Sequence, residues 1–166
     1  MLATITVGPG ATDRDSFASA PGTVIAKGNP ANASGALTKI ELWAYSNITN
    51  LKAGTFSDDG SDKYTPRDYE TIGTVTSGSK QTFTGLDCDV ATGDVIGAYW
   101  PANALERCTS GGAGSMYKVG DQFGAGQQTY SAYGAGVDIS IYGEGSTPAA
   151  RTPRHGFSIF QTPAVV

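Results

Sequence analysis

Short apolar runs separated by glycine-rich turns repeat along most of the chain. The stretch from Lys80 to Trp100 shows the pattern most clearly, because two apolar runs, Thr82 to Leu86 and Asp94 to Trp100, flank a polar connection that ends in Thr92-Gly93. A short continuous apolar run bounded by Gly and Asp predicts a buried strand rather than a helix. We therefore expect two strands here and take them as the spine of the fold.

Strict alternation of apolar and polar positions marks two further strands. Thr38 to Tyr45 places Ile40, Leu42 and Ala44 on one face, and Val137 to Tyr142 repeats the pattern with Val137, Ile139 and Ile141. Such alternation is typical of a strand with one face in a core. Shorter candidates bring the total to about ten strands: Thr4 to Val7, Thr23 to Lys27, Leu51 to Phe56, Thr71 to Val75, Met116 to Val119 and Phe157 to Phe160.

The absence of helical periodicity decides between the possible sheet types. Glycine or proline interrupts nearly every candidate helix, so the crossover helices that a parallel sheet needs are missing. The turn spacing favours an all-β fold, an antiparallel β-sandwich of jelly-roll type with two sheets packed face to face. Ser110 to Gly136 holds eight glycines and is expected to form long loops.

The composition changes near the C-terminus. We expect residues 1–145 to form the sandwich domain, and Ser146 to Arg154 to be a linker rich in Pro, Ala and Arg. Phe157 to Val166 then regains strand character. Two arrangements stay open for this tail: it completes its own sheet, or it adds a strand to a neighbouring subunit through Phe157, Ile159 and Phe160.

Charge and hydropathy exclude several classes of partner. The 11 basic and 15 acidic residues leave a net charge of −4, which argues against binding to nucleic acid. No apolar run approaches the roughly 20 residues that cross a bilayer, so no membrane partner is expected. The N-terminus, MLATITVGPG, has no basic segment followed by an apolar helix, so the sequence predicts synthesis in the cytoplasm without a signal peptide.

Few residues offer catalytic chemistry. The single histidine, His155, lies between Arg154 and Gly156 in the expected linker, which is a poor setting for a catalytic base. Glu41 beside Trp43 is the nearest approach to a glycosidase carboxylate, but ordinary surface acids are the simpler interpretation. Cys88 and Cys108 are too few for a disulfide framework, and the chain is predicted not to be an enzyme.

Two groups of residues are candidate binding sites. The aromatic residues Trp43, Tyr45, Tyr117, Tyr130 and Tyr133 are candidates for a sugar-stacking platform, a subunit interface or part of the core. Asp58, Asp59 and Asp62 form an acidic turn that resembles half of a calcium loop, but it lacks the twelfth-position Glu of an EF-hand and a solvated hairpin tip is the favoured interpretation. No other cofactor is expected.

Three stretches give the chain a resemblance to a known group of proteins. Lys27-Gly28-Asn29-Pro30-Ala31-Asn32 leading into Leu37 to Tyr45, then Gly93 to Gly97, then Ile139 to Gly143 resemble small glycine-rich β proteins of tailed-phage and environmental viral sequences. The resemblance covers residues 4–145 and implies a structural role in a virion or tail.

The leading hypothesis from sequence is a non-enzymatic structural protein of a virion or another extracellular assembly. Its expected partners are copies of itself or other virion proteins. A carbohydrate-binding module that recognises surface glycans through the aromatic residues is the alternative, and the two roles are compatible.

Overall fold

The computed structural model describes residues 3–19 and 21–148, which form thirteen β-strands. Within these residues there is no helix of the length and hydropathy needed to cross a bilayer. In chain order the strands are β1 (Thr4–Gly10), β2 (Ser16–Ser19), β3 (Gly22–Ala26), β4 (Gly35–Trp43), β5 (Ile48–Asp58), β6 (Lys63–Val75), β7 (Lys80–Val90), β8 (Val95–Trp100), β9 (Ala104–Arg107), β10 (Ser115–Val119), β11 (Gln128–Thr129), β12 (Ser131–Gly134) and β13 (Ile141–Ser146).

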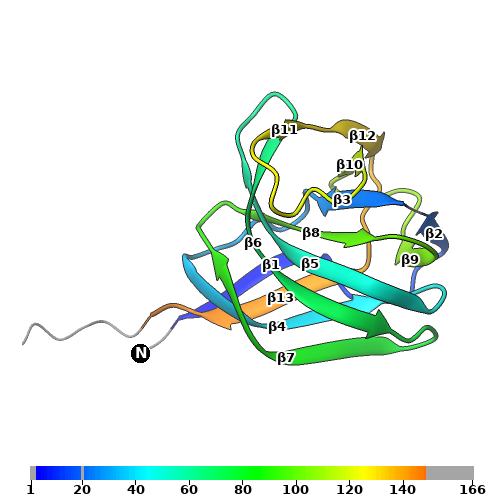
Figure 1. The fold of residues 1–166 in the computed structure, drawn as a ribbon, viewed down its shortest axis with the longest axis horizontal. Coiled ribbons are helices and arrows are strands. Elements are labelled where there is room, and N and C mark those ends of the chain that lie inside the picture. Colours follow the sequence, from blue (N-terminus) through cyan, green and yellow to red (C-terminus); the bar gives the residue numbers. More distant parts are fainter. Residues whose placement is uncertain (1–2, 20, 149–166) are drawn as a thin grey trace, which may run out of the picture.

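Eight of these strands build a jelly-roll sandwich. One sheet has the order β1-β13-β4-β7, and the centre of the opposing seven-stranded sheet has the order β6-β5-β8-β3. All strand pairs between named strands are antiparallel, and the first and last described strands are neighbours. Figure 1 shows the two sheets facing each other. The expected all-β sandwich of jelly-roll type is therefore confirmed.

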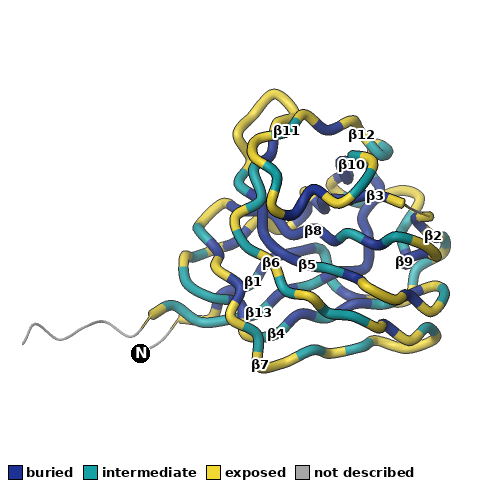
Figure 2. Tube along the Cα trace, in the orientation of Figure 1, coloured by how far each residue is buried: buried dark blue, intermediate teal, exposed yellow. Residues whose placement is uncertain are grey.

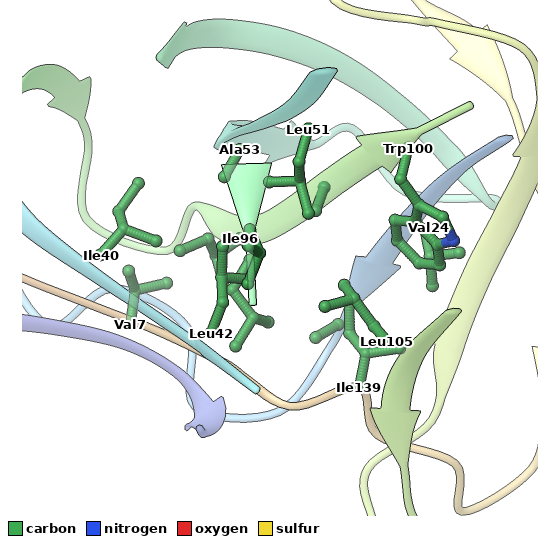
Figure 3. Close-up of a cluster of buried hydrophobic side chains, with 14 of the residues drawn as sticks. Val7, Val24, Ile40, Leu42, Leu51, Ala53, Ile96, Trp100, Leu105 and Ile139 are labelled. Atoms are coloured by element: carbon green, nitrogen blue, oxygen red, sulfur yellow. The ribbon is translucent and has the colours of Figure 1, made fainter. Parts of the chain in front are cut away.

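The main core lies between the two sheets. Ile40 and Leu42 of β4 and Ile96 and Trp100 of β8 are fully buried and project from opposite sheets into the space between them (Figure 3). Figure 2 shows buried stretches along the strands that face this core. Their spacing follows the period of two, because alternate side chains of a strand face the same side. β8 is buried along nearly its whole length, which confirms the sequence prediction for the run that ends at Trp100.

A second, smaller core lies on the other face of the seven-stranded sheet. That sheet curls so far that its two outermost strands, β11 and β12, are separated in the chain by Tyr130 alone. The enclosed side chains are Ile25, Phe56, Tyr64, Val95, Met116, Phe123 and Tyr130. Gly97 of β8 makes room for this core, because a β-carbon there would lie 2.9 Å from a ring carbon of Phe56.

Side chains cover both free edges of the four-stranded sheet. At β1, the Asn32 amide accepts a hydrogen bond from Thr6 N (2.9 Å) and donates one to Thr4 O (3.2 Å). Asn29 donates from its side chain to Gly8 O (3.1 Å), and its carbonyl accepts from Gly8 N. The edge groups that would otherwise pair with a further strand are therefore occupied.

The β7 edge is covered in a different way. Two carboxylates of β6 reach across: Glu70 accepts from Asp87 N (2.9 Å), and Asp68 accepts from Asp89 N (2.8 Å). These contacts join the two sheets along one side of the sandwich.

The two ends of the described chain meet at one end of the sandwich. Thr147 N donates to Ala3 O, and Ala3 N donates to the Thr147 hydroxyl, each over 3.1 Å. The small sheet of β2 and β9 lies at the opposite end (Figure 1). The predicted tail strand, with Phe157, Ile159 and Phe160, lies outside the described residues.

Two sequence expectations need correction. Ser110 to Gly136 is not purely loop, because it contains β10, β11 and β12. The stretch Val137 to Tyr142 is not one alternating strand with a wet face, since Asp138 and Ser140 are also buried and the strand begins only at Ile141. Both polar side chains are covered by loops, and Ser140 donates to Thr12 O (2.6 Å).

Candidate functional site: an aromatic strip at one end of the sandwich

A stacked pair of exposed rings marks the end of the sandwich where β2 and β9 lie. The chain leaving β4 continues beside β9, because Tyr45 N donates to Ala104 O (3.0 Å). This places the Tyr45 ring against Phe17 of β2, with centroids 4.6 Å apart and an angle of 26° between the planes. Tyr45 is 54% exposed and Phe17 is 44% exposed, so two large rings face solvent together.

Arg107, the last residue of β9, connects this pair to two more rings. Its Nε donates to the carbonyl of Phe17 (2.6 Å), and its guanidinium lies 5.6 Å from the ring centre of Tyr133. Tyr133 in turn lies 5.8 Å from Tyr117, whose hydroxyl donates to Pro21 O (2.9 Å). We call these five linked side chains the aromatic strip: Tyr45, Phe17, Arg107, Tyr133 and Tyr117.

The strip is built from several strands that are distant in the sequence. β2 and β9 supply Phe17 and Arg107, whereas β12 and β10 supply Tyr133 and Tyr117. β10 pairs with β12, and β2 pairs with β9, so each half of the strip rests on its own strand pair. Four of the five side chains are therefore held on strands, and Tyr45, which follows β4 in a bend, is tied to β9 by its backbone hydrogen bond to Ala104; this favours a preorganised binding surface.

Three of the five predicted aromatic residues belong to the strip, and two do not. Trp43 lies half-buried on the outer face of β4, where its neighbour across the sheet is Lys80 of β7. Tyr130 is only 3% exposed and packs edge-on against Tyr64 in the second core, with ring centres 5.5 Å apart. Burial raises the pKa of the Tyr130 hydroxyl above its ordinary value, and a ligand at the surface does not reach this ring.

Phe17 and Arg107 were not among the residues that the sequence indicated. Phe17 lies in a short segment with no alternation, and Arg107 follows Glu106 in what resembles an ordinary charged strand end. Only the pairing of β2 with β9 brings Phe17 to Tyr45.

The acidic turn between β5 and β6 is held by protein donors. The Asp59 carboxylate accepts hydrogen bonds from Ser57 (2.8 Å), Thr65 (2.6 Å) and Gln127 (2.9 Å). These bonds, with that from Thr65 the strongest, lower the pKa of Asp59. Asp58 accepts from Gly60 N (3.0 Å), and the carbonyl of Asp62 accepts from Tyr130 N.

Asp58, Asp59 and Asp62 therefore organise a hairpin tip. Asp59 and Asp62 also tie this tip to Gln127 and Tyr130, the residues on either side of β11. Across the described part of the chain, no three His, Cys, Asp or Glu side chains are grouped to hold a metal ion.

Glu41 has two lysine partners on the outer face of the four-stranded sheet. Its carboxylate lies 3.6 Å from Lys39 Nζ and 3.3 Å from Lys80 Nζ. Lys39 also binds Glu144 (3.0 Å), and this hydrogen bond raises the pKa of Lys39. Glu41 is therefore the shared partner of two lysines in a surface ion-pair cluster.

A shallow pocket of about 470 Å³ lies at the end of the same sheet where the termini meet. Its titratable lining side chains are Asp87 and Asp89, with Gly35, Ala36 and Thr38 beside them. Among the described residues that line it, no hydroxyl is hydrogen-bonded to the carboxylate of Asp87 or Asp89. Cys88, between the two aspartates, points into the core, and both cysteines are free thiols.

Comparison with protein-family models, with curated proteins and with solved structures gave no match.

Proposed function

We propose that this protein is a non-enzymatic component of a virion or another extracellular assembly and that it recognises surface glycans through the aromatic strip. The observation that carries the proposal is the exposed Phe17–Tyr45 stack, which continues through Arg107 to Tyr133. The two rings are about half exposed, and a partner that covers their apolar surface removes it from water.

The physical basis is the match between aromatic faces and pyranose rings. A sugar presents a face of C–H groups that packs on an aromatic ring, while its hydroxyls bond to neighbouring polar groups. Covering about 100 Å² of ring surface contributes about 2.5 kcal/mol. Binding to a single sugar is then weak, and useful affinity requires a longer polysaccharide or several copies of the protein.

The fold and the sequence resemblance support the same setting. Jelly rolls occur in viral capsid proteins and in lectins, which is an analogy of fold and not of site. The stretch from Lys27 to Asn32, on which part of the resemblance rests, supplies the Asn29 and Asn32 side chains that cover the β1 edge.

Affinity electrophoresis through gels that contain a panel of neutral and acidic polysaccharides tests the proposal. We expect retardation by at least one polysaccharide, and its loss in the Phe17→Ala/Tyr45→Ala double variant. Tyr69→Ala is the matched control, because Tyr69 is an exposed ring (38%) on β6 outside the strip. The proposal fails if no polysaccharide retards the protein, or if the control variant loses binding equally.

Self-association is the second candidate role for the aromatic strip. Tyr and Arg are enriched at protein interfaces, and the strip contains three tyrosines and one arginine. In contrast, both edges of the four-stranded sheet are covered by side chains, so growth by strand addition has little support there.

Light scattering after size exclusion separates the two roles. Self-association through the strip predicts an oligomer that dissociates in the Phe17→Ala/Tyr45→Ala variant. A chain truncated after Pro148 keeps β13 intact and tests the contribution of Phe157, Ile159 and Phe160. An oligomer lost only on truncation would assign assembly to the tail and leave the strip for glycan recognition.

A further inference from the structure

We infer that the saccharide recognised by the aromatic strip carries an acidic group, a carboxylate or a sulfate, and that Arg107 binds it. This inference rests on the proposed glycan recognition and adds the chemical class of the ligand. It starts from the unusual surroundings of the Arg107 side chain.

Arg107 is held in place by a backbone carbonyl and an aromatic ring, without a carboxylate partner among the described residues. A guanidinium has five N–H donors, and here Nε donates to the Phe17 carbonyl while the plane lies over the Tyr133 ring. In the part of the chain that the structure describes, the other four N–H donors make no hydrogen bond to protein. The fold therefore fixes the position of the group and leaves its terminal nitrogens available.

Arg107 is half-buried and has no carboxylate partner in the described part of the chain. Arg14 and Lys118 also lack one there, but their terminal nitrogens donate to Gly10 O and Thr129 O (3.2 Å each), whereas those of Arg107 have no protein partner among the described residues.

Other cations of the chain are paired with acids. Each of the following binds an acid within 4 Å: Lys39 with Glu144, Lys52 with Asp121, and Arg67 with Asp94. Among residues 3–19 and 21–148, no Asp or Glu lies within that distance of Arg107. An ion pair made to an incoming ligand therefore breaks no internal ion pair.

The chemistry of the guanidinium selects the ligand class. Its planar pair of terminal nitrogens matches the two oxygens of a carboxylate or sulfate, and such charge-assisted bonds are about twice as strong as neutral ones. A neutral sugar offers only hydroxyl groups to the same donors. With a net charge of −4 the protein does not attract polyanions as a whole, so an acidic glycan needs this specific contact.

The test uses the full chain with two pairs of probes. Polygalacturonate against neutral galactan tests carboxylate recognition, and heparin against dextran tests sulfate recognition. We expect at least tenfold weaker binding of the preferred acidic probe by Arg107→Gln. Arg107→Lys, which keeps the charge but loses the planar pair of donors, is expected to lie between. Lys27→Gln removes one exposed charge elsewhere and should bind like the unmodified chain.

The outcomes separate this inference from the proposed function. Binding to a neutral polysaccharide that is unchanged in Arg107→Gln overturns the inference and leaves glycan recognition in place. No binding to any polysaccharide overturns both. An equal loss in Arg107→Gln and Lys27→Gln also overturns the inference, since only overall charge would then matter. Thermal unfolding of each variant verifies that it is folded. If Arg107→Gln does not fold, the comparison of Arg107→Lys with the unmodified chain provides the test.

Discussion

Replacement of Asn32 by alanine tests whether side chains guard the edge of β1. The variant loses two hydrogen bonds, to Thr6 N and Thr4 O, without touching the core. Each bond contributes about 0.5–1.5 kcal/mol net, and because the site is exposed, water replaces part of it. We expect a loss of about 1–2 kcal/mol, which corresponds to a fall of about 3–6 °C in Tm for a chain of this size.

Two measurements on the same samples check this expectation. Urea denaturation gives the change in free energy of unfolding, and light scattering over a range of concentrations reports association through the opened edge. Asn32→Asp is the informative companion, since it keeps the acceptor for Thr6 N but loses the donor to Thr4 O. If Asn32→Ala unfolds at the same urea concentration as the unmodified chain and associates no more strongly, the edge is not guarded in this way.

Three further predictions concern packing, pH and thiol reactivity. Gly97→Ala should destabilise by about 1–3 kcal/mol, because its β-carbon would lie 2.8 Å from a carbonyl oxygen of β3, whereas Gly126→Ala, with open space around it, should be neutral in the same urea titration. The lowered pKa of Asp59 stabilises the folded state above about pH 4, and this contribution is lost as the pH falls through the pKa of the folded state. The free energy of unfolding of Asp59→Asn should therefore fall less between about pH 5 and 2.5 than that of the unmodified chain. Burial raises the pKa of Cys88 to about 12. A thiol reagent at about pH 8 should therefore modify only Cys108 in the native protein and both thiols in denaturant. Rapid modification of the native Cys108→Ser variant would contradict this.

The central strands were predictable because their sequence pattern and their environment agree. In β4 the alternation of Ile40 and Leu42 with polar residues matches a sheet with one wet face. In β8 the unbroken apolar run matches a strand between two cores, with Ile96 facing one and Val95 the other. The jelly-roll order follows once these strands are assigned to opposite sheets.

Other elements have no local pattern that predicts them. β6 is thirteen residues long, but only Thr71 to Val75 reads as a strand, because Pro66 and a run of charged residues occupy its first half. That half is stabilised by its pairing with β5 and by the burial of Tyr64, which are both tertiary effects. β11 and β12 are too short for any periodicity.

The candidate site was only partly predictable for the same reason. Aromatic residue type indicated Tyr45, Tyr117 and Tyr133, but type alone does not separate a surface ring from a core ring such as Tyr130. The role of Arg107 depends on a backbone carbonyl and a ring that are distant in sequence. Only the folded topology brings these groups together.

Ala3 and Thr147 lie together at one end of the sandwich, so its two ends are not equivalent. A support joined to the domain through either of these residues would hold it from one end, and β2 and β9, which carry Phe17 and Arg107, lie at the opposite end (Figure 1). Ala3 and Thr147 are also close enough to be linked by a short loop, so new termini opened elsewhere should leave the fold intact. If the proposed recognition holds, many copies anchored side by side would present their aromatic strips in one direction and gain avidity for a repeating polymer.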